Sequence, residues 1–107
     1  MTGRYPIVFI VLLTVAAGPA PGNGEAARRL MADHNAWLAQ GFDDGVFLLA
    51  GSLKPAAGGA ILAHGVSRDE IEARVMADPF VAGGVVTPRI VEVAPARSDA
   101  RLAFLAA

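Results

Sequence analysis

The chain has 107 residues, of which 54% are hydrophobic and 18% are charged, and its formal net charge is -1. This composition suits one folded domain with an apolar core, excludes a disordered chain, and leaves no basic surface charge that would indicate nucleic-acid binding. The chain has no cysteine, which excludes a disulfide framework, a zinc–thiolate site and a cysteine nucleophile, and which fits a reducing compartment.

The first apolar stretch, residues 7–13, has two interpretations. Arg4 before it and small residues after it are typical of an export signal, in which case residues 1 to about 20 would be removed. Its β-branched and aromatic residues, placed between Pro6 and the breaker cluster at 18–22, instead indicate a strand buried on both faces. We favour the strand and a cytoplasmic protein, because the predicted sheet is incomplete without this segment. No apolar run reaches the ~20 residues of a membrane span, so we expect no membrane insertion.

Residues 25–40 (EAARRLMADHNAWLAQ) predict a helix with one apolar stripe. On a helical wheel the centre of the stripe is a histidine, His34, and within about 60° of it lie five apolar residues: Ala27, Leu30, Met31, Trp37 and Leu38. The charged residues and Asn35 fall on the other side. Gly41 is expected to follow the helix as its C′ residue.

A hairpin is predicted next. A turn at 43–45 contains Asp43 and Asp44, for which we expect a solvated turn and no metal site. Residues 46–53 (VFLLAGSL) form a strand that is apolar on both faces, residues 54–59 a loop, and residues 60–65 a third strand. His64, at the end of that strand, is expected to be exposed.

A second helix follows the hairpin. Ser67 and Glu70 have the S-x-x-E spacing of a capping box, which opens a helix. The helix is expected to end at residues 77–78, because Pro79 cannot continue it. Residues 79–84 then serve as a short connector.

The predicted order is β-α-β-β-α-β, which is the ferredoxin-like arrangement of the α+β class: a four-stranded antiparallel sheet with both helices on one face. The last strand, 85–95, contains Pro88, which indicates an edge position or a bulge. We treat residues 1–107 as a single domain with its core at about 6–95 and a C-terminal extension at 96–107.

Two helices cover only one face of such a sheet, yet the strands at 7–13 and 46–53 are apolar on both faces. The second face therefore needs a partner, and in a chain of this size a second copy is the economical one. We predict a homodimer that packs through the sheet face as a dimeric α/β barrel.

Two polar residues on inward faces are the candidates for chemistry. His34 lies where a leucine is expected, and Asp78 falls in line with the inward Ile71 and Val75 at the end of the second helix, where a carboxylate opposes the helix dipole. Each could be satisfied locally, His34 by a backbone carbonyl and Asp78 by amides around Pro79. A His–Asp pair satisfies both at once and leaves one imidazole nitrogen free as a base.

Several runs of the chain carry a family resemblance. FIVLLT, DHNAWLAQG, FLLAGSL, GGAILAHG and SRDEIEARVMADPFVAGGVV, with RIVEVAP at the end, resemble the YCII-related family over about residues 7–95. Its most specific marks fall on His34 and on Asp78-Pro79-Phe80. The resemblance implies a dimeric ferredoxin-like domain with a His–Asp active site. It also implies proton transfer on small oxygenated acids, because one relative is a dehydrochlorinase and the fold is similar to muconolactone isomerase.

We therefore expect a cofactor-free lyase or isomerase in which His34 and Asp78 are catalytic and act on a small oxygenated acid or lactone. Gly51 and Ser52 stand where many family members have Gly-Pro, and with Trp37 and Phe80 they are the expected substrate-binding residues. For Ser52 a plain turn serine is the alternative. No metal and no cofactor are expected, and the expected partners are a small-molecule ligand and a second copy, not nucleic acid or a membrane.

A different class of function also fits the sequence. In a non-catalytic ligand-binding or regulatory dimer, the His–Asp pair would be a buried polar bridge. Access distinguishes the two, because an enzyme needs His34 to be reachable from solvent through a cleft, whereas a structural bridge can be sealed.

Overall fold

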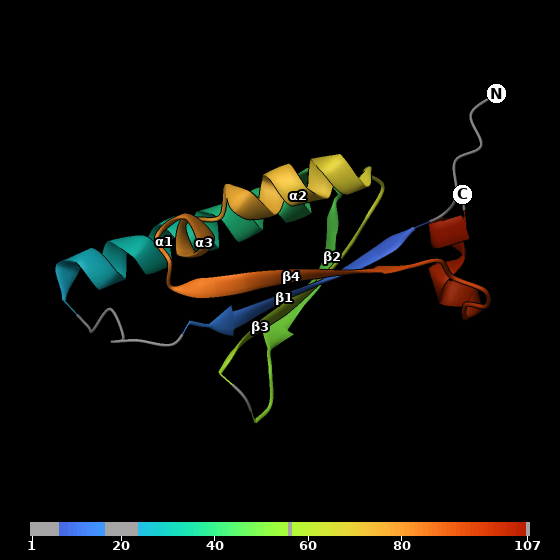
Figure 1. Ribbon diagram of the computed structural model, residues 1–107. Coiled ribbons are helices and arrows are strands. Elements are labelled where there is room, and N and C mark those ends of the chain that lie inside the picture. The colour runs from blue at the N-terminus through green and yellow to red at the C-terminus, as the bar shows by residue number, and fades with distance from the viewer. Residues whose placement is uncertain (1–6, 17–23, 56, 107) are drawn as a thin grey trace.

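A computed structural model of the protein describes residues 7–16, 24–55 and 57–106. Figure 1 shows an order of elements that matches the predicted one, with an additional short helix before the last strand and a helical turn near the C-terminus. The elements are β1 (Val8–Val15), α1 (Glu25–Asp43), β2 (Phe47–Ser52), β3 (Gly58–His64), α2 (Arg68–Met76), α3 (Pro79–Ala82), β4 (Val86–Val93) and a 3-10 segment (Ala100–Ala106).

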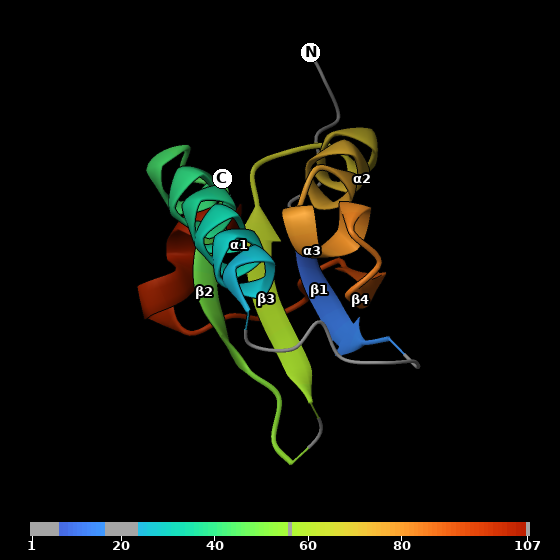
Figure 2. The same cartoon turned by 90° about the vertical axis from the view of Figure 1, so that its left-hand side faces the viewer.

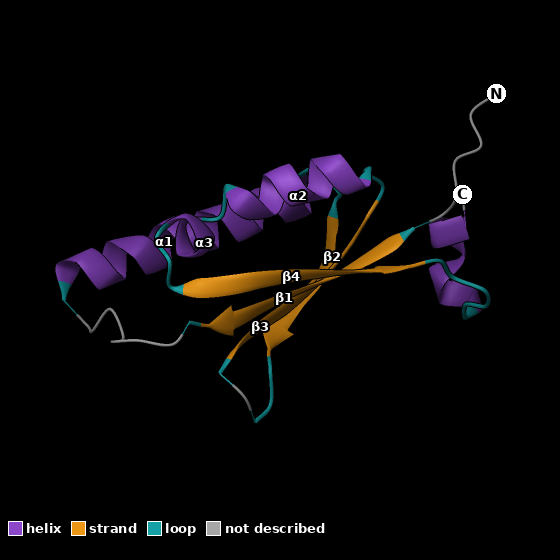
Figure 3. Cartoon of the chain, viewed as in Figure 1, coloured by secondary structure: helices purple, strands orange, loops and turns teal. Residues whose placement is uncertain are grey.

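The four strands form one antiparallel sheet in the order β2-β3-β1-β4. Figures 1 and 2 show α1, α2 and α3 on the same side of this sheet, and Figure 3 shows the two layers by element type. The predicted ferredoxin-like α+β fold is therefore confirmed. β4 is an edge strand, which agrees with Pro88 lying inside it, because an edge strand can lack one backbone donor.

The first apolar stretch forms a central strand of the sheet. β1 pairs with β3 on one side and with β4 on the other along most of its length. Phe9 and Val11 are 1% and 0% exposed and point at the helices, where Ile61 of β3 and Ile71 and Val75 of α2 complete the core. Residues 8–15 are thus part of the fold, as the strand interpretation predicts.

α1 is longer than predicted, and Gly41 does not end it. The helix continues to Asp43, and Gly41 is buried within its last turns. A Cβ atom built on Gly41 would lie 2.1 Å from the ring of Phe47, so glycine is needed here for close packing. The left-handed residue after the helix is Gly45, with φ of 74°. Among the described residues, no helix combines the length and apolar character that crossing a membrane requires.

The region after α2 also differs from the prediction. The capping box is present, since Ser67 Oγ accepts from the Glu70 N–H and the Glu70 side chain accepts from the Ser67 N–H. The expected connector at 79–84, however, begins with the helix α3. Asp78 is the N-cap of α3, so its carboxylate stabilises the start of a helix and does not oppose the end of one.

The face of the sheet opposite the helices carries a row of apolar residues from all four strands, and in a neighbouring row Arg89 lies in register with Leu12. Ile10 lies in register with Leu62 and Val91, and Leu62 lies in register with Leu49, which is 64% exposed.

At one end of the sheet, His64 is half-buried and its ring contacts the edge of Phe104 at a centroid distance of 5.5 Å. The expectation of an exposed His64 is therefore wrong, because the C-terminal segment covers it.

Candidate active site

His34 and Asp78 form a direct polar contact between α1 and the start of α3. His34 Nδ1 lies 2.7 Å from Asp78 Oδ1, and the two side chains are 12% and 0% exposed. The two inward-facing polar residues identified from the sequence are thus brought together. A carboxylate that is completely buried needs such a partner, because desolvation of its charge is otherwise very unfavourable.

The local sequence Asp-Pro-Phe explains how the aspartate is held. Pro79 occupies the first turn of α3, where its missing N–H is not needed. Asp78 caps that helix, since its Oδ1 accepts from the Phe80 N–H at 3.0 Å. The Phe80 ring then stacks on the His34 imidazole with a centroid distance of 4.1 Å and an interplanar angle of 13°. Three consecutive residues therefore fix the aspartate, the helix start and one face of the imidazole.

Trp37 is a second aromatic neighbour of the imidazole. It lies one turn after His34 on α1, and the two rings stack with their centroids 5.8 Å apart. Its indole N–H donates to the Arg74 carbonyl oxygen at 3.0 Å, and its ring meets the edge of Phe47. The imidazole consequently stacks with two aromatic rings, which restrict its rotation.

This geometry assigns the hydrogen on the neutral imidazole. An ionised carboxylate only accepts hydrogen bonds, so the Nδ1 that faces Asp78 carries the hydrogen. Nε2 is then unprotonated and can accept a proton from a ligand. Asp78 Oδ2, in contrast, is buried and has no hydrogen-bond partner among the residues that the structure describes.

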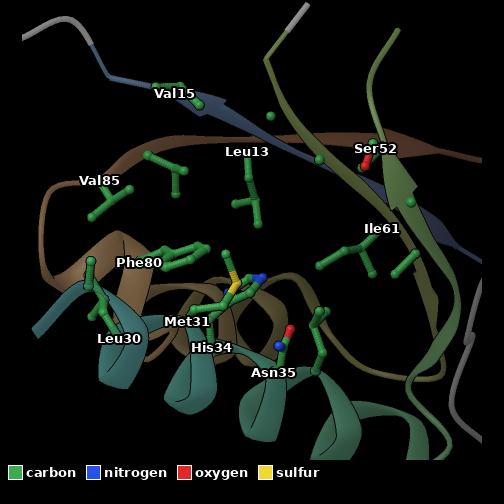
Figure 4. Close-up of a pocket in the computed structure, with 18 residues that line it drawn as sticks. Leu13, Val15, Leu30, Met31, His34, Asn35, Ser52, Ile61, Phe80 and Val85 are labelled. Carbon is green, nitrogen blue, oxygen red and sulfur yellow. The ribbon is translucent and has the colours of Figure 1, made fainter. Parts of the chain in front are cut away.

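A cavity of about 540 Å³ lies between α1 and the sheet, and His34 is one of its lining residues (Figure 4). Most of its wall is apolar and includes Leu13, Leu30 and Phe80. Met31 and Val15 also line it although they are 50% and 47% exposed, so the cavity opens to solvent. A site of this volume with a few polar groups is typical of small-molecule binding.

Small residues on the hairpin make room for the cavity. Ala50, Ser52 and Gly59 line it from β2 and β3, where larger apolar side chains would fill the space below α1. In the register of the sheet, Ser52 lies beside Gly59, and Gly59 lies beside Leu13. The small side chains at the hairpin end of β2 and β3 therefore leave open space between the sheet and α1.

The residues expected in the site fall into two groups. His34, Gly51, Ser52 and Phe80 line the cavity. Asp78 and Trp37 are not among the lining residues and instead hold His34 from behind and from the side.

Asn35 lines the cavity as well, although the helical wheel places it on the outer side of α1. Figure 4 shows Asn35 beside His34, and Ser52 across the cavity on β2. The sequence contains one indication of this position. Asn35 directly follows His34 and so lies about 100° from it on the helical wheel, next to the edge of the apolar stripe. Because the cavity opens at that edge of α1, the Asn35 amide lines it.

Comparisons with known proteins agree on the family and the fold. The model of the YCII-related domain matches residues 9–95. No curated protein matches the chain. Among solved structures, the chain is similar to 5-chloro-2-hydroxyhydroquinone dehydrochlorinase (TftG) from Burkholderia phenoliruptrix AC1100 in complex with 2,5-dihydroxybenzoquinone. The TM-score is 0.59 and the identity 19%, over 78% of this chain and 90% of that chain, which supports a shared fold.

Proposed function

The chain belongs to the YCII-related family, and from this premise we propose that it is a small lyase or isomerase in which His34 transfers a proton on a small oxygenated acid or lactone. One observation carries the proposal. The imidazole of His34 lines an open cavity of about 540 Å³ while its other side is fixed by a fully buried carboxylate. A base that a ligand can reach and whose orientation is fixed is what proton transfer requires.

The proposed step begins at a carbon next to a carbonyl group. Nε2 of His34 takes the proton, and the electron pair of the C–H bond moves toward the carbonyl oxygen. Asp78 stabilises the resulting imidazolium, and Ser52 or a backbone N–H near Gly51 donates to the oxygen that becomes negative. The imidazolium then returns the proton to another carbon in an isomerase, or the electron pair expels a leaving group such as chloride in a lyase. The groups named here are all supplied by the chain, so no cofactor is part of the proposal.

The solved relative supports the choice of compounds for a first test. TftG is named as a dehydrochlorinase of a chlorinated hydroxyhydroquinone. Loss of hydrogen chloride from a substrate combines proton removal with chloride departure, which is the lyase form of the step above. Chlorinated hydroxy compounds, hydroxy acids and lactones are therefore the compounds to screen.

Exchange of carbon-bound hydrogen in heavy water tests the proposal without knowledge of the natural substrate. Proton NMR follows the loss of the signal from the hydrogen on the carbon next to the carbonyl group in each compound. We expect His34→Ala to slow exchange by about 100-fold or more, because a positioned base contributes about 10²–10⁴-fold. His64→Gln is the matched control, since His64 is not among the residues that line the cavity, and its exchange rate is expected to equal that of the parent.

Equal exchange rates in the parent and in His34→Ala would refute the role of His34. Binding of a compound at the cavity without any exchange would favour the second candidate function, a non-catalytic ligand-binding module. Ligand access alone does not distinguish the two, since both need an open cavity, and the exchange measurement does.

Two further proposals concern the whole chain. We propose a homodimer that buries the apolar face opposite the helices, which is supported by the row of Leu49, Leu62, Ile10 and Val91. We also propose a cytoplasmic protein, which is supported by the central position of β1, because cleavage near residue 20 would remove that strand. The intact mass of the protein from its native host tests the second proposal, and a mass lacking the first ~20 residues would contradict it.

A further inference from the structure

The cavity beside His34 offers no positive charge to a ligand. Of the described residues that line it, only His34, Asn35 and Ser52 have polar side chains, and none is a lysine or an arginine. A carboxylate that entered this cavity would therefore lose its hydration without gaining a cationic partner.

Electrostatics behind His34 add to this effect. Asp78 is fully buried next to the ring, and its Oδ2 has no hydrogen-bond partner within the described part of the chain. When His34 is neutral, the pair carries a negative charge, which repels an anion. When His34 is protonated, the charges of the pair cancel, and the site still has no net positive charge. Arg74, which faces this part of the core, lies over the Phe47 ring and pairs with Asp44.

We propose that the cavity selects an uncharged oxygenated ligand, a ketone, lactone or quinone with an apolar body, and excludes carboxylates. This rests on the proposed function and decides between the acid and the lactone that it allows. Burial of an unpaired carboxylate is unfavourable, and the hydrogen bonds that neutral donors supply do not fully offset that loss of hydration.

The polar groups of the cavity suit such a ligand. His34 and Asn35 lie together on α1, and Ser52 lies across the cavity on β2 (Figure 4). A ligand with an oxygen at each end can thus bond to α1 at one end and to β2 at the other, with its apolar body against Leu13 and Met31. The amide of Asn35 can donate or accept a hydrogen bond, so it can bind an uncharged oxygen of the ligand.

A pair of compounds with nearly the same shape tests the proposal. 4-Hydroxyacetophenone and 4-hydroxybenzoate differ in a neutral acetyl group against a carboxylate. The side-chain NMR signals of His34 and Asn35 are followed as each compound is added to the parent protein at about pH 7, where the carboxylate is ionised. We expect the ketone to bind at least about tenfold more tightly than the acid.

A charge placed in the cavity should reverse this preference. Asn35→Arg puts a cation on the lining, and we expect the affinity for 4-hydroxybenzoate, relative to that for the ketone, to rise by about tenfold or more. Ala39→Arg is the matched control, because Ala39 is an exposed residue of α1 that does not line the cavity. With that variant, the affinity for both compounds should stay as in the parent.

The outcomes separate this proposal from the proposed function. If the acid binds the parent as tightly as the ketone, or if Asn35→Arg and Ala39→Arg strengthen acid binding equally, charge selection is wrong while proton transfer by His34 stands. If neither compound shifts the signals of His34 and Asn35 at its solubility limit, the cavity does not bind compounds of this kind and charge selection is wrong, whereas the role of His34 is decided by the exchange measurement.

Discussion

Two polar residues in otherwise apolar patterns identify the central part of the site. His34 stands out because every neighbour on its helix stripe is apolar, and Asp78 because it continues the inward line of Ile71 and Val75. Both residues are buried or nearly so and lie 2.7 Å apart, as the sequence predicts. Asn35 could not be predicted in the same way. Its place in the cavity depends on the small residues of a distant hairpin, and no helical pattern within α1 reports on those.

Asp78 stabilises the fold as well as the imidazole, and its replacement separates the two roles. Asp78→Ala leaves the Nδ1–H of His34 and the N–H of Phe80 without their acceptor in a buried place. We expect the free energy of unfolding to fall by about 2–4 kcal/mol, from two unpaired donors and a lost helix cap. Urea denaturation measures this loss.

Asp78→Asn keeps an oxygen at the position that accepts both hydrogen bonds, so we expect a smaller loss of stability than with alanine. Asp33→Ala, on the exposed surface of α1, is the control for removal of a carboxylate and is expected to change stability by less than about 0.5 kcal/mol. Equal losses for Asp78→Ala and Asp33→Ala would show that the buried contacts contribute nothing to stability.

The elements were predicted best where the signal is local. The capping box of α2 and the β-branched composition of β1 each depend on residues within a few positions of one another, and both elements are present. The predicted end of α1 is wrong because a glycine can either end a helix or allow close packing within one. A glycine near a helix end is typical of a C′ residue, but at Gly41 the ring of Phe47 leaves no room for a side chain, and this tertiary contact is not contained in any local pattern. α3 was missed because four residues give too short a pattern.

An ion pair links the end of α1 to α2. Asp44, just after α1, lies 3.0 Å from Arg74 of α2, whose backbone carbonyl accepts from Trp37. The hydrogen bond from Gln40, and then that from Arg74, lower the pKa of the Asp44 carboxyl below its usual value of 3.8. The ionised form is therefore favoured in the folded state more than in the unfolded state.

This lowered pKa fixes the direction of a pH effect. The contribution of Asp44 to stability is present above a pH of about 3.8 and is lost as the pH falls through the lower pKa of the folded state. We expect Asp44→Asn to be less stable than the parent at about pH 7 and the difference to shrink toward about pH 3 in urea denaturation. Asp43→Asn, the neighbouring exposed carboxylate, is the control. A difference that stays constant across this range would exclude ionisation of Asp44 as its cause.

At the scale of the whole molecule, the two faces of the sheet differ in what packs against them. The face toward the helices carries the core at one end and the cavity at the other, where Ala50, Ser52 and Gly59 replace larger residues. The opposite face carries apolar residues from every strand in the same register row. The sequence predicted that this face is apolar, because strands that are apolar at every position cannot hide both faces under helices on one side.

A charge in the middle of that row tests the proposed homodimer. Leu62→Glu places a carboxylate between Leu49 and Ile10 on the face opposite the helices. If a second copy packs there, the charge would be buried without a partner, and we expect the dimer to weaken by more than about 100-fold. Sedimentation equilibrium on the parent and the variant measures this change, and circular dichroism verifies that the variant is folded.

Met76→Glu is the matched control, because Met76 is 61% exposed on α2, on the other side of the sheet, and the same charge there should leave the dimer intact. Sheet-to-sheet packing requires the parent to be a dimer and Leu62→Glu to be a folded monomer. A parent that is monomeric at micromolar concentration contradicts the dimer itself. A dimer that survives Leu62→Glu but is lost in Met76→Glu would move the interface to the helices, where it would also change which residues border the opening of the cavity.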